Sequence, residues 1–247
     1  MMGDEDKSSK LQKLSSWKEE RDTIAKYIKQ KASIDYALNI LEAGCGTHWG
    51  LDLDGVQYTL TGVDIDKNAL DIRKNKNRDL DIAILGDLRT ITLEERYYDV
   101  IYNSNVLEHV GGAERILKNF IRWLKPGGNL ILLIPNRDSA KAFLTRMTPF
   151  WFHIFYYRHI KGEKNSGKPG HGPFPTVFDK VVSRKGIYEF CEKHGLVIRA
   201  EYSAGHGRKV SRTFGILRKL LVWIVHLISF RKLTAKHTDL IYIIEKP

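Results

Sequence analysis

A glycine turn and two acidic side chains, Glu42 and Asp64, lie close together in the first third of the sequence. The mostly apolar residues 38–43 are followed by Gly44 and Gly46, and a second apolar run, residues 58–63, ends at Asp64. Glycine lets the backbone turn sharply and approach a ligand closely, because it has no Cβ atom. A carboxylate at the end of the next strand can accept hydrogen bonds from two ribose hydroxyls. The pattern predicts a nucleoside-binding crevice at the carboxyl ends of two parallel strands.

The residues around the turn favour a cationic ligand over a dinucleotide. The dinucleotide fingerprint needs a third glycine, which packs a helix on the strand, at the position where Trp49 stands. The acid before the turn, Glu42, is badly placed for a diphosphate but suits a ligand with an amino group. An acid, two glycines and a later ribose-binding acid resemble motifs I and II of the class I S-adenosylmethionine-dependent methyltransferases.

Three later segments match the same family in the family's order. Residues 82–87 resemble its third strand, whose terminal acid, here Asp87, holds the adenine amino group. Residues 98–109 resemble its fourth strand and the following loop, and residues 124–130 the turn into its fifth strand. The resemblance covers about residues 38–135 and implies S-adenosyl-L-methionine as cofactor. The residues that it assigns to cofactor binding are Arg21, Glu42, Gly44, Cys45, Gly46, Asp64, Ile65, Asp87, Leu88 and Asn103.

The resemblance also implies the fold and the domain organisation. We expect an α/β, Rossmann-like sheet of seven strands, mostly parallel with an antiparallel last strand, helices on both faces and inserted substrate-side helices or a lid. The single domain, residues 1–247, would consist of an N-terminal helical cap (1–36), a cofactor-binding half (37–136) and a basic substrate-side half (137–247).

The segment after the glycine turn departs from the family pattern. His48 stands where a third glycine often precedes a full helix, and residues 47–55 lack a helical period. We therefore expect a shortened or irregular helix, which weakens any helix-terminus contribution to anion binding. The upstream segment 16–22 resembles a Trp-x-x-x-Arg segment of some bacterial relatives, so Arg21 can pair with the methionine carboxylate. A solvated arginine on an amphipathic helix is the alternative.

Composition and charge indicate a cytoplasmic protein with an anionic partner. The two cysteines provide no disulfide framework, and the acidic amino terminus lacks the apolar stretch of a signal peptide. Residues 137–247 contain 21 Lys and Arg against 8 Asp and Glu, whereas the chain as a whole has a net charge of +11. The basic excess therefore lies entirely in the substrate-side half. It favours a phosphate- or carboxylate-bearing molecule, a membrane surface or nucleic acid, with solubility as the alternative.

Two features of the basic half bear on the substrate. The insertion at 140–180 holds an aromatic cluster (147–159), which can line a pocket, stack on a planar substrate, enter lipid headgroups or pack against the sheet, and a basic loop (161–175) suited to a lid. Residues 208–232 predict an amphipathic helix whose apolar run is shorter than the ~20 residues of a membrane span. Its wide apolar face and basic polar face fit a helix at an anionic membrane surface, the protein's own core or a dimer partner.

Methyl transfer to an oxygen or nitrogen that starts protonated needs a base. His109 follows the fourth strand on the family's active-site side and is our candidate, with a structural role as the alternative. With Glu108 it also resembles a cation contact of quinone-precursor methyltransferases, but two adjacent residues are weak evidence and we assign no metal.

The sequence thus favours a methyltransferase acting on a small or lipid-linked, anionic acceptor, at oxygen. We expect it in the cytoplasm, with contact at the inner membrane face. The rivals are an RNA methyltransferase that uses the basic half for phosphate contacts, with nucleic acid the less favoured partner, and a non-catalytic cofactor-binding regulator. The sequence leaves the oligomeric state open.

Overall fold

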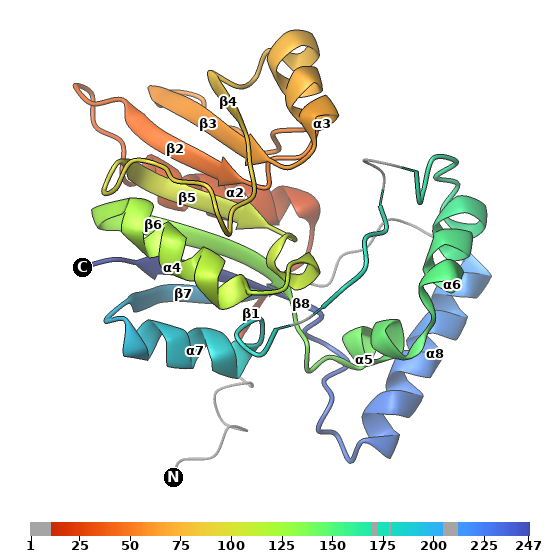
Figure 1. Cartoon of the computed structure of the whole chain (residues 1–247). Helices are drawn as coiled ribbons and strands as arrows, with labels where there is room; N and C mark the ends of the chain where they lie inside the picture. The colour runs from red at the N-terminus through yellow and green to blue at the C-terminus, as the bar shows by residue number, and fades with distance from the viewer. Residues whose placement is uncertain (1–10, 169–171, 178, 205–211) are drawn as a thin grey trace.

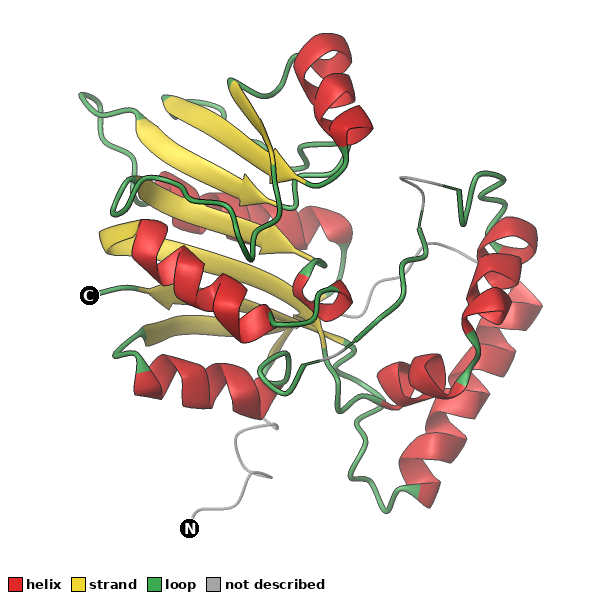
Figure 2. Ribbon diagram, in the orientation of Figure 1, coloured by secondary structure: helices red, strands yellow, loops and turns green. Residues whose placement is uncertain are grey.

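A computed structural model, which describes residues 11–168, 172–177, 179–204 and 212–247, contains a sheet of eight strands with helices on both faces (Figures 1 and 2). The strand order is β1-β7-β8-β6-β5-β2-β3-β4. The strands are β1 (Gln12–Leu14), β2 (Leu38–Ala43), β3 (Tyr58–Asp64), β4 (Ile82–Leu85), β5 (Tyr98–Ser104), β6 (Leu124–Pro135), β7 (Val197–Ala204) and β8 (Asp239–Glu245).

The predicted α/β, Rossmann-like sheet is confirmed, with one more strand than expected. β8 is antiparallel to both of its neighbours, β6 and β7, while the other pairs are parallel. The additional strand, β1, pairs parallel with β7, with Gln12 opposite Tyr202. Three residues are too few to show a strand period, so sequence patterning did not reveal β1.

Serine hydroxyls cap the first turn of several helices. The helices are α2 (Trp17–Lys29), α3 (Lys67–Asp71) with its π-helical continuation η1 (Ile72–Asn77), the 3₁₀ turn η2 (Leu107–His109), α4 (Ala113–Trp123), α5 (Ala140–Met147), α6 (Phe150–Phe155) with the π-helical η3 (Tyr156–Ile160), α7 (Arg184–Lys193) and α8 (Arg212–Ile228). The hydroxyl of Ser16 caps α2 by accepting from the Glu19 N–H, and that of Ser183 caps α7 by accepting from Gly186.

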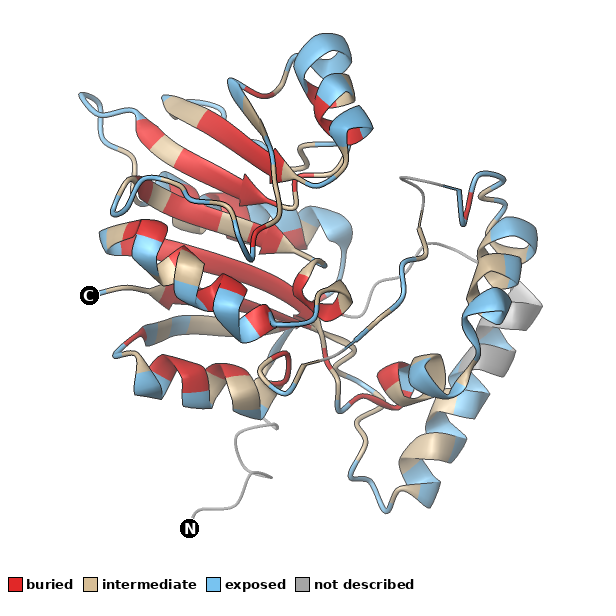
Figure 3. Ribbon diagram, viewed as in Figure 1, coloured by how far each residue is buried: buried red, intermediate tan, exposed pale blue. Residues whose placement is uncertain are grey.

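The core lies in two layers, one on each face of the sheet (Figure 3). Alternate residues of β6 show this division, because successive strand side chains point to opposite faces. Leu130 and Leu132 join the layer that includes α4 and α7, whereas Ile131 and Leu133 join the layer that includes α2. Burial on both faces fixes β6 and its neighbours, and with them the edge formed by the strands' carboxyl ends.

The turn predicted at residues 124–130 is not a separate turn. α4 ends at Trp123 and β6 begins at Leu124, so the Pro-Gly-Gly sequence lies inside the strand. The register against β5 jumps from Tyr98 opposite Leu124 to Val100 opposite Asn129, and Gly127 has a φ of +75°. The glycines therefore form an irregularity in the strand rather than its beginning.

The connection between β2 and β3 contains no helix. Residues 44–57, all of which the structure describes, form turns and irregular backbone. The departure expected after the glycine turn is therefore present. Leu51 and Leu53 are buried in the layer beneath α2 and anchor this loop without a helical period.

A separate group of helices lies beyond the carboxyl ends of the parallel strands (Figure 1). α5 follows β6, and α8 lies between β7 and β8 in the chain. α5 packs against α8, and the Thr234 carbonyl after α8 accepts a hydrogen bond of 2.9 Å from the Ala140 N–H. α8 ends at Ile228 rather than at 232, and residues 208–211 of the predicted helix lie outside the described residues.

The aromatic cluster of the insertion does not pack against the sheet. α6 and η3, which the structure describes in full, contain no buried residue. Among the described helices none is both long and apolar enough to cross a membrane. The insertion thus exposes a group of aromatic side chains that a simple core role does not explain.

Candidate active site

The glycine turn lies at the carboxyl end of β2. Gly44 and Gly46 have φ values of +74° and +52°, which side chains other than glycine rarely adopt. A Cβ on Gly44 would lie 2.3 Å from Cγ2 of Val106, so this position also excludes a side chain sterically. A Cβ on Gly46 would meet nothing within 4 Å. The backbone of Gly46 therefore borders open space that a ligand can occupy.

Asp64 at the end of β3 lies beside this turn, as predicted. One carboxylate oxygen accepts from the Gly46 N–H at 2.8 Å and the other from the Asp66 N–H at 2.9 Å. Each carboxylate oxygen has a further lone pair, so both can still accept from ligand hydroxyls. The neighbouring Ile65 is 76% exposed. An exposed apolar side chain beside a carboxylate suits a ligand with both a planar and a hydroxylated part.

Asp87 and Leu88 follow β4, whose end is joined to β3 by a 3.0 Å hydrogen bond from the Gly86 N–H to the Asp64 carbonyl. The Asp87 carboxylate binds Arg89, with 2.5 Å between Nη2 and Oδ2, and this partner lowers the pKa of Asp87. Because both side chains are partly exposed, solvent screens the pair and a ligand can compete with Arg89. The side chain of Leu88 lies in the core.

Glu42 contacts an internal cation that the sequence did not reveal. The fully buried Arg73 of η1 donates to the Glu42 carboxylate at 2.8 Å, to the Asp79 carboxylate at 2.7 Å and to the Cys45 carbonyl at 2.7 Å. Burial raises the pKa of Glu42, and the Arg73 guanidinium opposes that rise. Burial also raises the pKa of the Cys45 thiol to about 12, which makes it unreactive at neutral pH.

Side chains from η1 and the residues just after it hold the loop that replaces the expected helix. In addition to the bond from Arg73 to Cys45, the Asn77 amide donates to the Thr47 carbonyl at 2.9 Å, and the Asp79 carboxylate accepts from the Trp49 N–H at 3.3 Å. Alternate residues of the loop are thus fixed from one short element. In the sequence, residues 73–79 have the composition of a solvated face, and only their contacts reveal this function.

Asn103 of β5 is fully buried beneath the turn. Its amide nitrogen donates to the Ala43 carbonyl at 2.7 Å, while its Oδ1 has no hydrogen-bond partner among the described residues. A buried acceptor without a partner is uncommon in folded proteins. The Oδ1 atom therefore provides a hydrogen-bond acceptor next to the residues of the turn.

Arg21 lies over the irregular loop. It is an exposed residue of α2, and a Cβ built on Gly50 would lie 3.6 Å from its Cδ. The cap helix and the helix-free loop are therefore neighbours. This places a cationic side chain on the side of the turn where the family's helix terminus would have been.

His109 ends η2, at the same edge of the sheet. Its Nδ1 lies 2.9 Å from the Pro175 carbonyl oxygen, and the Phe174 ring contacts it edge-on at 5.8 Å. Since a carbonyl can only accept, Nδ1 carries the hydrogen and the neutral ring has its lone pair on Nε2. Burial lowers the pKa of His109, so the neutral form dominates at pH 7.

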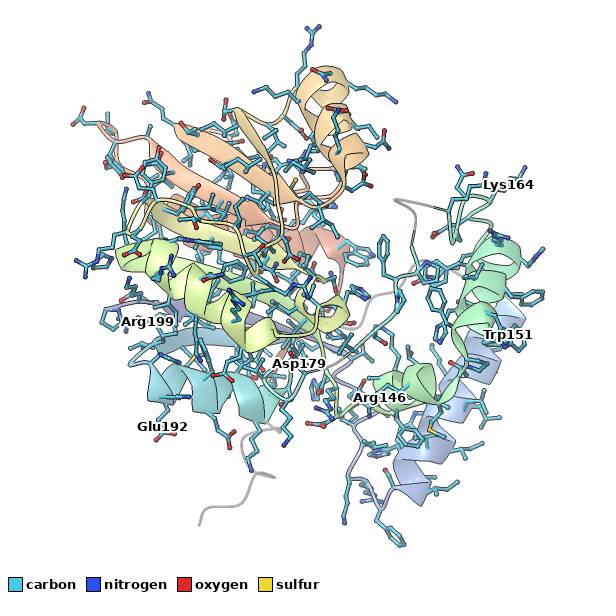
Figure 4. All side chains as sticks on the ribbon, in the orientation of Figure 1. Arg146, Trp151, Lys164, Asp179, Glu192 and Arg199 are labelled. Atoms are coloured by element: carbon cyan, nitrogen blue, oxygen red, sulfur yellow. The ribbon has the colours of Figure 1, made fainter. Side chains whose placement is uncertain are left out.

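The end of the predicted lid, Phe174 and Pro175, contacts His109. The Val177 N–H donates to the Glu108 carbonyl at 2.8 Å, so residues 172–177 lie along η2. Asp179, which follows them, caps α4 by accepting from Gly112 and Ala113 at 2.6 and 2.8 Å (Figure 4). The segment is anchored on both sides of His109 and fixes the orientation of its ring.

Glu108 is buried next to this ring. One of its carboxylate oxygens lies 3.6 Å from Nε2 of His109, and the other has no hydrogen-bond partner among the described residues. Burial raises its pKa to about 7. No cluster of three or more His, Cys, Asp or Glu that would hold a metal ion is present in the described part of the chain.

Glu108→Gln is expected to stabilise the protein at pH 8 but not at pH 4.5. Because the pKa in the folded state is about 7, the stability that protonated Glu108 contributes is full below its unfolded pKa and is lost as the pH rises through 7. The neutral amide avoids this loss, which is about 3 kcal/mol at most. Denaturant unfolding of Glu108→Gln, with the exposed Glu114→Gln as control, measures it. An equal gain in the free energy of unfolding at both pH values would contradict the raised pKa of Glu108.

Comparison with known proteins identifies the family of this chain. The family model described as a methyltransferase domain matches residues 8–201. A ubiquinone biosynthesis O-methyltransferase from Coxiella burnetii is 31% identical over 125 residues, 48% of this chain and 52% of that protein. A probable S-adenosylmethionine-dependent methyltransferase from Mycolicibacterium smegmatis is 32% identical over 114 residues, 45% of this chain and 44% of that protein. The matches thus span about half the length of these relatives.

Solved structures share the fold over nearly the whole chain. A putative methyltransferase, solved in complex with a methyltransferase activator from Haloferax volcanii, has a TM-score of 0.57 at 13% identity, with 93% of this chain and 91% of that chain covered. A putative sarcosine dimethylglycine methyltransferase from Galdieria sulphuraria has a TM-score of 0.56 at 14% identity, with 92% and 85% covered. At these identities the likeness concerns the fold alone. With the family match over residues 8–201, the chain belongs to the methyltransferase-domain family.

Proposed function

We propose that this methyltransferase acts on an oxygen of a small or lipid-linked, anionic acceptor, with His109 as the general base. The observation that carries the proposal is the hydrogen bond from Nδ1 of His109 to the Pro175 carbonyl, which leaves the lone pair on Nε2. An acceptor hydroxyl placed beside Nε2 would lose its proton there as the oxygen becomes a nucleophile.

The residues at the strand ends fit the cofactor. When bound, S-adenosylmethionine supplies an electrophilic methyl group on a sulfonium. We assign the ribose hydroxyls to Asp64, one face of the adenine to Ile65 and the adenine amino group to Asp87. The open space at Gly46 and the orphan Oδ1 of Asn103 support a ligand at this turn.

Two further assignments follow from charge. We assign the methionine carboxylate to Arg21, because the loop between β2 and β3 has no helix terminus to bind an anion. Glu42 would act on the ligand's amino group at a distance, since Arg73 already contacts its carboxylate. Its main part in this proposal is to hold Arg73, and with it the Cys45 carbonyl of the turn.

The choice of acceptor draws on the basic half and on the relatives. Residues 137–247 hold 21 Lys and Arg against 8 Asp and Glu, which favours an acceptor with phosphate or carboxylate groups. The Coxiella burnetii relative is named an O-methyltransferase, which supports oxygen as the acceptor atom. A lipid-linked acceptor would be reached at the inner membrane face.

Labelled cofactor separates the candidate acceptors. The protein is incubated with S-adenosylmethionine carrying a labelled methyl group and, separately, with lipid, small-molecule and RNA extracts. We expect label in the lipid or small-molecule extract and none with His109→Ala. Label in RNA would overturn the acceptor class. Binding of S-adenosylhomocysteine without transfer to any extract would instead support a non-catalytic regulator.

Asp64→Ala is expected to weaken S-adenosylhomocysteine binding by roughly tenfold to a hundredfold. The substitution removes a charged acceptor for two hydroxyls, and such hydrogen bonds contribute about 1.5–3 kcal/mol. Titration calorimetry measures the affinity. Asp54→Ala is the control, because Asp54 is an exposed acid in the connection between β2 and β3. Equal affinities of the two variants would remove Asp64 from the site.

A further inference from the structure

The apolar side of α8 faces solvent. Among the side chains of α8 that the structure describes, those of Ile216, Leu220, Trp223, Ile224, Leu227 and Ile228 are 40–72% exposed, and that of Leu221 is 44% exposed. With a helical period of about 100° per residue, these positions and Leu221 share an arc of roughly 200°, with Lys219 at its edge. Val222, Val225, His226 and Ser229 lie on the other side and are half-buried. This is the reverse of a helix that packs its apolar face on a core.

The neighbouring elements also expose apolar surface. Met147, at the end of α5, is 68% exposed, and Trp151 of α6 is 67% exposed. Trp151 projects from α6 away from the sheet (Figure 4). Exposed apolar surface of this extent marks an interaction site rather than ordinary surface.

The charge of these elements is almost entirely positive. Residues 140–168 and 212–236 contain twelve Lys and Arg and one acid, Glu163. Their net charge of +11 equals that of the whole chain, so the positive and negative charges of the remaining residues cancel. Arg231 and Lys232, just after α8, are exposed. The apolar arc is thus accompanied by cations and nearly free of anions.

We propose that the exposed face of α8 docks on a bilayer that contains anionic lipids. The helix of 17 residues lies in the plane of the interface, with its apolar arc at the acyl boundary and the cations at the headgroups. Aliphatic side chains dominate the arc and cannot stack on bases, which disfavours RNA. A second copy would bring two strongly positive helical groups together, which disfavours a dimer.

The topology connects this face to the active site. β6 leads into α5 and β7 leads towards α8 at the edge where the glycine turn and His109 lie. Docking through α8 would therefore present that edge to molecules held in the bilayer. This consequence, though not the docking itself, rests on the lipid-linked acceptor of the proposed function.

The test uses the full chain and two kinds of vesicle. We expect flotation with vesicles of phosphatidylcholine and phosphatidylglycerol and little flotation with phosphatidylcholine alone. The double variant Leu220→Glu, Leu227→Glu should reduce the bound fraction at least about tenfold, because two apolar side chains leave the interface. Both positions are 55% exposed, so the fold tolerates charge there. The control is Ile34→Glu, at a 92% exposed position before β2, and should leave binding unchanged.

A spectroscopic measurement locates the contact. Brominated acyl chains should quench part of the tryptophan fluorescence of the wild-type protein, and Trp223→Phe should abolish that part. Circular dichroism of each variant confirms that it is folded.

Four results would overturn the proposal. They are no flotation with anionic vesicles, flotation unaffected by the double variant, a dimer that the double variant dissociates without vesicle binding, and RNA binding without vesicle binding. Failure of the proposed function is distinguishable, because a protein that floats but labels no lipid extract retains the docking face and loses only the lipid-linked acceptor.

Discussion

Arg73→Ala is expected to lower the free energy of unfolding by about 3–5 kcal/mol. The guanidinium is fully buried and contacts two carboxylates and one carbonyl, so its removal leaves Glu42 as a buried charge without its cation. Arg73→Lys should recover part of the loss, because an ammonium is one point charge and cannot reach three partners as a planar fork does. Denaturant unfolding at pH 7 measures all three proteins.

Arg73→Ala should also bind S-adenosylhomocysteine more weakly than the wild-type protein does, under conditions in which both proteins are folded. The bond from Arg73 to the Cys45 carbonyl is one of the contacts that hold the glycine turn in place of a helix. Lys76→Ala is the matched control, since Lys76 is an exposed cation of the same π-helical element. The role of this network would be contradicted if Arg73→Ala lowered the free energy of unfolding by less than about 1 kcal/mol, or if Lys76→Ala lowered it equally.

His109→Ala is expected to reduce kcat by about 10²–10⁴, the usual contribution of a general base, and to leave cofactor affinity unchanged. The substitution removes the Nε2 lone pair but none of the groups at the glycine turn. Because burial lowers the pKa of His109, wild-type activity should be full at pH 7 and fall only below the ordinary histidine pKa of about 6.5. Initial rates with the acceptor found by labelling, measured from pH 5 to 8, test both statements.

The control for this variant is His194→Ala. Burial also lowers the pKa of His194, but this residue follows α7 at the opposite edge of the sheet, before β7 begins. It should retain wild-type kcat and the acid limb of the pH profile. If His109→Ala kept both as well, another group would have to accept the proton.

Local patterning was sufficient to predict the residues at the strand ends. A buried strand followed by a glycine turn is specified within ten residues, so Gly44, Gly46 and Asp64 were located from the sequence, and Gly46 and Asp64 are in contact. The helix caps at Ser16 and Ser183 are equally local, because each joins residues three apart in the sequence. The missing helix after the turn also followed from a local lack of periodicity.

What the sequence did not predict depends on contacts between distant segments. Arg73 is 31 residues from Glu42, and Pro175 is 66 residues from His109. Such pairs have no period or motif, and only the assembled sheet brings them together. The face that α8 exposes was undetermined for a related reason, since the same apolar arc can be turned towards a core or towards solvent.

The pairing of β1 with β7 has a consequence for how the chain folds. The first described strand lies against residues near 200, and the hydroxyl of Tyr27 on α2 contacts that of Tyr202 at 2.8 Å across 175 residues of sequence. Contacts of such long range form late, because the intervening chain must first be closed. During synthesis the N-terminal cap therefore cannot complete its docking until the final strands have emerged.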